Sequence, residues 1–237
     1  MVFINLETSD LEILGIEYYE VSRYIDACSR EDQGLLGSVG ERLHTIAWIM
    51  EQFHKNPPHG DRAKHDILSQ LIYMLLSCGD NLGRHWVPSV GPGGRFRAFF
   101  RNLPLLAKDR LLNAFVIERL TLPIPTSYQA SSIATILSQR NSTSISVLVA
   151  EVEDCFYAWR NASTHDSGSP DHSIMFSNLA AAYRGDRVYT SGYPLLIHWD
   201  RQSGNPSQMF RLFINTDDPI GDLRATVIYS IKEILGL

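Results

Sequence analysis

The stretch ISVLVAEVEDCFYAWRNASTH, residues 145–165, decides the fold class of this chain. Its apolar residues recur every three or four positions and therefore share one face of a helix: Ile145, Leu148, Val149, Val152, Cys155, Phe156 and Trp159. Asn141 and Ser142 come just before it and can cap its first turn. A helix with so wide an apolar face must pack against other elements of a folded domain.

Helical patterns also fill most of the chain before this stretch. The apolar spacing predicts helices over residues 9–30, 35–53, 62–85, 105–120 and 127–139. The second of these ends at Asn56-Pro57-Pro58-His59-Gly60. Residues 87–94, which are rich in Gly and Pro, are interpreted as a flexible basic loop. These helices together predict a bundle.

The pattern of apolar residues changes after residue 168. Short apolar runs at 187–189, 195–199 and 209–214 are separated by Gly, Asn, Asp and Pro, which is typical of strands, and a last helix is expected over 220–235. The predicted fold is therefore mainly α. It consists of a helical bundle over residues 1–168 and a C-terminal α+β extension over 169–237, packed on the same domain.

The amino-acid composition limits the kinds of protein that this chain can be. The 237 residues are 44% hydrophobic, which is enough to fill a core. Cys28, Cys78 and Cys155 are too few and too far apart for a disulfide framework, so we expect reduced thiols. The start of the chain lacks the pattern of a signal peptide, and no apolar run is long enough to span a bilayer. We therefore expect a cytoplasmic protein without a membrane partner.

The charge is distributed unevenly along the chain. The net charge is -5, yet residues 81–108 contain no Asp or Glu. This segment carries five cations, Arg84, Arg95, Arg97, Arg101 and Lys108, interleaved with His85, Trp86 and three phenylalanines. Such a composition predicts an anion-binding surface suited to RNA. The alternative is a solvated loop whose aromatic residues belong to the core.

The end of the 145–165 helix carries the residues best suited to chemistry. Asn161 and His165 are four apart and so lie on one face, and the long side chain of Arg160 can reach the same region. An imidazole can transfer protons at neutral pH, and a guanidinium can bind a phosphate through two hydrogen bonds. This combination fits attack of an RNA 2′-hydroxyl on the adjacent phosphate without a metal. Alternatively, the helix dipole alone favours a C-terminal His, and Arg160 pairs with Glu153 or Asp154.

The arrangement Arg160-Asn161-x-x-x-His165 resembles the signature of the HEPN superfamily, which includes RNA-cleaving toxins and antiviral effectors. The resemblance covers residues 1–168. It implies a metal-independent endoribonuclease that leaves a 2′,3′-cyclic phosphate, with Arg160, Asn161 and His165 as catalytic residues and Asp80 as a supporting acid. It also implies a homodimer with a composite active site, and an antitoxin or regulatory partner is expected with a toxin of this kind.

Other patterns in the sequence give weaker support to a metal centre, a nucleotide-binding loop or a serine hydrolase site. Glu41-x-x-His44 and Glu51-x-x-His54 resemble half-motifs of di-iron bundles but share a single helix, so no metal is expected. The segment 91–94 lacks the Lys-Ser/Thr of a phosphate-binding loop, and there is no Gly-x-Ser-x-Gly. The predicted function is thus a HEPN-type endoribonuclease without a cofactor. The alternative is a non-catalytic helical module that binds RNA, a nucleotide or a protein partner.

Overall fold

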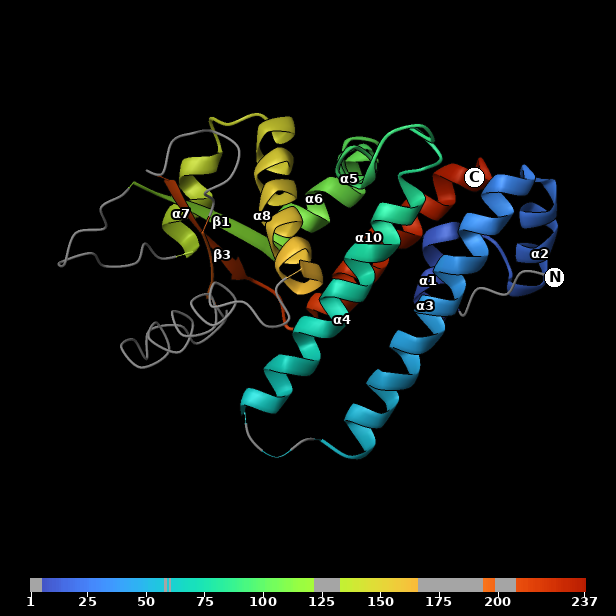
Figure 1. Cartoon of the computed structure of the whole chain (residues 1–237), viewed down its shortest axis with the longest axis horizontal. Helices are drawn as coiled ribbons and strands as arrows, with labels where there is room; N and C mark the ends of the chain where they lie inside the picture. Colours follow the sequence, from blue (N-terminus) through green and yellow to red (C-terminus); the bar gives the residue numbers. More distant parts are fainter. Residues whose placement is uncertain (1–5, 58, 60, 122–132, 166–193, 199–207) are drawn as a thin grey trace. The chain divides into compact units, whose positions relative to one another are not determined.

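The structure, a computed structural model, describes residues 6–57, 59, 61–121, 133–165, 194–198 and 208–237 (Figure 1). Within these residues the chain is mainly helical with a small sheet, which confirms the predicted fold class. It forms two compact units: unit 1 comprises residues 1–108 and 220–237, and unit 2 comprises residues 109–219. This grouping differs from the predicted division at residue 168, a position that lies outside the described residues.

Unit 1 is helical. Its elements are α1 (Thr8–Leu14), α2 (Tyr18–Ala27), α3 (Arg30–Lys55), α4 (Asp61–Leu82), α5 (Pro92–Arg101) and α10 (Pro219–Leu235). The long helices α3 and α4 lie side by side as an antiparallel hairpin (Figure 1). Ser29 caps the start of α3, because its side chain accepts a hydrogen bond from the Asp32 amide. Asn56 caps the end of α3, where the sequence predicted a stop.

The single helix predicted over residues 9–30 is wrong, because the structure divides it into α1 and α2. Gly15 ends α1 in the left-handed conformation, with φ at 73°, and its amide donates to the Leu11 carbonyl. The second helix starts after Glu17, whose carboxylate and that of Glu20 form a capping box. Apolar spacing alone did not reveal this break, because α1 and α2 each bury one side.

The α5 helix was not predicted. Residues 87–94 were interpreted as a loop, but α5 starts at Pro92, with Gly91 as its N-cap. It crosses the end of α4 so closely that a Cβ added to Gly83 would lie 1.9 Å from the Arg95 carbonyl oxygen. A Cβ on Gly79 would lie 2.8 Å from the Phe99 ring. These two glycines permit the α4–α5 contact, so the glycines of this region serve packing as well as turns.

The α10 helix completes unit 1 and matches the helix predicted over residues 220–235. Most of its side chains are buried, including Leu223, Val227, Ile228 and Ile231. Residues 220–237 therefore group with the helices of unit 1.

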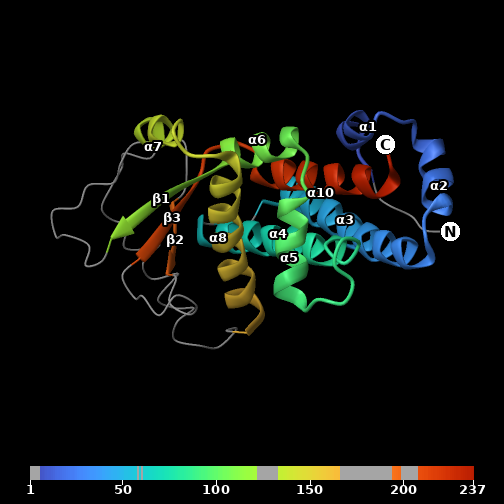
Figure 2. The ribbon, with the colours of Figure 1, turned by 90° about the horizontal axis from the view of Figure 1, so that it is seen from above.

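Unit 2 places a three-stranded sheet among helices. Its elements are α6 (Leu105–Ala114, whose first residues fall in unit 1), β1 (Phe115–Thr121), α7 (Ile133–Arg140), α8 (Ile145–His165), β2 (Pro194–His198) and β3 (Gln208–Ile214). The strand order is β1-β3-β2, and both pairings are antiparallel (Figure 2). Phe115 lies opposite Ile214, and Pro194 lies opposite Phe213.

The helix predicted over residues 105–120 is wrong in its second half, because the chain changes from α6 to β1 at Phe115. Phe115, Val116 and Ile117 are buried, and the strand is completed by pairing with β3, about a hundred residues later in the sequence. The Asn215 amide donates to the Ala114 carbonyl at 2.7 Å and fixes the start of this pairing. Apolar spacing within residues 105–120 could not reveal the pairing with β3, so the strand was not predicted.

The helices α7 and α8 both contact β1, and α8 also contacts β2. Val116, Ile136 and Phe213 form a core cluster with Leu137 packed against it. The predicted strands at 195–199 and 209–214 correspond to β2 and β3, whereas the one at 187–189 lies outside the described residues. In the part of the chain that the structure describes, no helix is long and apolar enough to cross a membrane.

Candidate functional site

The predicted catalytic residues lie at the C-terminal end of α8. The backbone is helical through His165, so Asn161 and His165 are separated by one helical turn and Arg160 directly precedes Asn161. The Arg160 side chain is half-buried and interacts with other groups. The side chains of residues 161–165 are outside the described part of the structure, so the three groups are related here by the helix backbone.

The apolar face of α8 packs the first half and the middle of the helix against the sheet. Phe156 is fully buried and meets Phe115 of β1 edge-to-face, with ring centroids 4.9 Å apart. Leu148, Val149 and Val152 are buried on the same face. Ile145 is 39% exposed, so the apolar face begins a turn later than the sequence predicted.

The predicted supporting acid, Asp80, belongs to a different unit from the motif. It is half-buried on α4 of unit 1, where it interacts with other groups, whereas the motif is on α8 of unit 2. The role of Asp80 as a supporting acid stays a prediction.

The five cations of residues 81–108 differ in their surroundings. Arg84 and Arg101 are exposed at the two ends of the segment. Arg95 is half-buried, its Nη2 donates to the Pro88 carbonyl at 3.3 Å, and its Nε is buried. The Lys108 Nζ donates to the Arg101 carbonyl at 2.9 Å, and Arg97 is half-buried and interacts with other groups.

The aromatic residues of the same segment serve mainly the core. Phe96, Phe99 and Phe100 are buried, and their rings pack together with centroids 5.0 Å apart for both the 96–100 and the 99–100 pair. Their positions along α5 put them on one face, while Arg97 and Arg101, four residues apart, share another. The cations and the phenylalanines therefore do not form one mixed surface.

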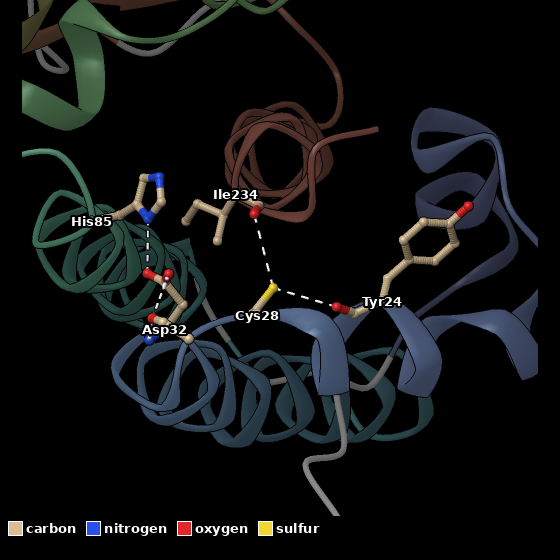
Figure 3. Close-up of polar contacts among 6 residues, drawn as sticks. Tyr24, Cys28, Asp32, His85 and Ile234 are labelled. Atoms are coloured by element: carbon tan, nitrogen blue, oxygen red, sulfur yellow. Dashed lines mark hydrogen bonds and ion pairs between the residues drawn. The ribbon is translucent and has the colours of Figure 1, made fainter.

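Sequence reasoning missed a contact between Asp32 and His85, which are 53 positions apart. The His85 Nδ1 lies 2.8 Å from the Asp32 Oδ1. The Ser29 hydroxyl donates to the other carboxylate oxygen of Asp32 at 2.8 Å. Figure 3 shows the imidazole with Nδ1 toward Asp32 and Nε2 pointing away from it. The ring also meets Trp86 edge-on.

The three cysteines are free, as predicted. Burial raises the pKa of Cys78 to about 12 and also raises the pKa of Cys155. Cys28 is half-buried at the end of α2, and its thiol contacts the Tyr24 and Ile234 carbonyl oxygens at 3.4 and 3.9 Å (Figure 3). Burial, with a contribution from Asp32, raises the pKa of Cys28 as well, so none of these thiols is an activated nucleophile.

Among the residues that the structure describes, no three His, Cys, Asp or Glu side chains gather in a way that could hold a metal ion. The Glu-x-x-His pairs at 41–44 and 51–54 follow one another on α3.

Comparison with known proteins adds no relative. No protein-family model, no curated protein and no solved structure matches the chain.

Proposed function

We propose that the protein is a metal-independent endoribonuclease of HEPN type. The observation that carries the proposal is the sequence Arg160-Asn161-x-x-x-His165 on the last turns of α8. A permanent cation, a carboxamide and a titratable imidazole at this spacing can together serve metal-independent cleavage of RNA.

In the proposed reaction the RNA 2′-oxygen attacks the adjacent phosphorus, and the bond from phosphorus to the 5′-oxygen breaks. His165 accepts or donates the protons that leave the 2′-hydroxyl and reach the 5′-oxygen. Arg160 stabilises the charge that develops on the phosphorus oxygens, and Asn161 orients the phosphate by donating a hydrogen bond. The products are a 2′,3′-cyclic phosphate and a 5′-hydroxyl.

The resemblance also supports a biological role and an assembly. We propose a homodimer in which two copies of the motif form one composite site, acting in the cytoplasm as a toxin or antiviral effector with an antitoxin or regulatory partner. In this scheme Arg84, Arg95, Arg97, Arg101 and Lys108 bind the RNA, and Asp80 supports the motif.

The test is cleavage of end-labelled RNA by the purified protein in the presence of EDTA. We expect His165→Ala to lower the rate by about 10²- to 10⁴-fold and Arg160→Ala by about 10²- to 10³-fold. Arg160→Lys should recover little, because an ammonium cannot form the paired hydrogen bonds of a guanidinium. His54→Ala and Arg23→Ala are matched controls, since both side chains are exposed in unit 1.

Parental activity in Arg160→Ala or His165→Ala, with circular dichroism showing a folded protein, would refute the mechanism. Cleavage of an RNA whose 2′-hydroxyls are replaced by hydrogen would refute it as well. If the parental protein binds RNA but never cleaves it, the alternative of a non-catalytic RNA-binding module holds. Expression in a host offers an independent comparison, because the parental protein should slow growth and Arg160→Ala should not.

A further inference from the structure

We infer that unit 1 binds single-stranded RNA through its phosphates alone, along a surface that starts at the Asp32-anchored imidazole of His85. We call Arg84, His85, Arg97 and Arg101 the basic ridge. The inference rests on the proposed function for its ligand, and it adds the mode of binding and a residue, His85, to it.

The basic ridge spans two adjoining elements, because the end of α4 touches α5. Gly83 lies against the Arg95 carbonyl, so the turn that holds Arg84 and His85 meets the first turns of α5. From there α5 continues to Arg101, whose carbonyl oxygen accepts a hydrogen bond from the Lys108 Nζ. Because Arg84 and Arg101 are exposed at the two ends, a strand that follows α5 meets a cation at each end.

His85 has a fixed orientation. Asp32 holds Nδ1 at 2.8 Å, and Ser29 in turn holds Asp32, so the ring cannot rotate freely. The side chain of His85 is 31% exposed, and Nε2 points away from the carboxylate (Figure 3). A protonated imidazole in this position donates from Nε2 to a phosphate oxygen while Asp32 accepts from Nδ1. Asp32 is thus a positioning residue for His85.

The contact along α5 is to phosphates because the three phenylalanine rings of this helix are in the core, and Trp86 beside His85 is half-buried. Phe96, Phe99 and Phe100 have exposed fractions of 0, 2 and 0%. Stacking platforms for single-stranded RNA need exposed rings. Binding through cations alone should depend steeply on salt and little on base sequence.

The experiment measures the affinity of the folded, full-length Arg160→Ala protein for a labelled single-stranded RNA by fluorescence anisotropy, at several salt concentrations. We expect Arg84→Ala and Arg101→Ala each to reduce the slope of log K against log salt by about 0.7 in magnitude. His85→Ala and Asp32→Asn should weaken binding at every salt concentration. RNAs of different sequence, a DNA strand of equal length and inorganic polyphosphate should compete.

Arg23→Ala and His54→Ala are the matched controls, because they remove the same types of exposed side chain from α2 and from the far end of α3. Melting temperatures separate a binding defect from a folding defect. Unchanged slopes in both arginine variants, unchanged affinity in His85→Ala, or a strong base preference would overturn the inference. RNA binding with this pattern but without cleavage by the parental protein would refute the proposed nuclease and leave the inference standing. Absence of RNA binding by the parental protein would overturn the inference directly.

Discussion

Asp10 on α1 and Arg224 on α10 form a buried ion pair that joins the first and the last helix of unit 1. The Arg224 Nε donates to Oδ1 and Oδ2 of Asp10 at 3.1 and 2.9 Å, and Nη2 donates to Oδ2 at 2.6 Å. The Asp10 carboxylate also accepts from the Glu7 amide at 2.7 Å. Nearby, Lys232 Nζ donates to the Ile13 carbonyl at 2.7 Å, so α10 holds α1 by two contacts.

We expect Asp10→Ala to lower the free energy of unfolding by about 3–5 kcal/mol, because it leaves the Arg224 guanidinium buried without its carboxylate. Glu12→Ala is the control: this exposed acid on the same helix should change stability by about 0.5 kcal/mol or less. Urea denaturation followed by circular dichroism gives both values. Equal losses in the two variants would show that the pair contributes nothing special.

The α4–α5 crossing gives a second prediction. Gly83→Ala should destabilise by about 1–3 kcal/mol, because the new methyl group would lie 1.9 Å from the Arg95 carbonyl oxygen and force the helices apart. Gly34→Ala is the matched control within α3, where the added methyl meets nothing within 4 Å. It should stabilise by about 0.5–1 kcal/mol, since alanine restricts the unfolded chain. Thermal melts of the pair should therefore shift in opposite directions.

Thiol reactivity should follow burial. Cys28 is half-buried, whereas Cys78 and Cys155 are completely buried. A thiol reagent at neutral pH should therefore label Cys28 first, and the other two only on the timescale of unfolding. Mass spectrometry of labelled peptides gives the order, and denatured protein should label all three at similar rates. Fast labelling of Cys78 in the folded protein would contradict the packing of α4.

Stability should decline at alkaline pH. In the unfolded chain a thiol loses its proton near the ordinary pKa of 9.0, whereas in the folded protein the pKa of Cys78 is about 12. Between these values the folded state holds the Cys78 proton and the unfolded state releases it, so the free energy of unfolding falls as the pH rises. Cys78 alone contributes up to about 1.4 kcal/mol per pH unit to this decline. Cys78→Ala should flatten this part of the stability curve. A curve of unchanged slope would argue that the thiol is accessible to water.

Much of unit 1 could be predicted from the sequence, because its helices follow local rules. The apolar spacing of α3, α4 and α10 and the proline-rich stop after α3 depend on residues close together in the chain. The break at Gly15 was missed because the apolar period continues through it. The start of α5 at Pro92 was missed because the Gly and Pro residues around it were interpreted as a loop. The strand β1 was missed for another reason: its partner β3 lies far along the chain.

The candidate sites also differ in whether nearby or distant residues form them. The spacing of Arg160, Asn161 and His165 is a property of one helix and could be read directly. The contact of His85 with Asp32 could not, because it depends on α4 returning along α3.

Local patterns were enough to predict the mainly helical class, the amphipathic α8 and the motif at its end, since each depends on residues within a few turns of one another. The folded structure was needed to show that Arg224 pairs with Asp10, that Phe96, Phe99 and Phe100 are core residues, and that Asp32 orients His85. Helical periodicity depends on residues that are close together in the chain. Burial and ion pairing depend on contacts between distant segments, and these contacts form only when the side chains of the whole unit pack together.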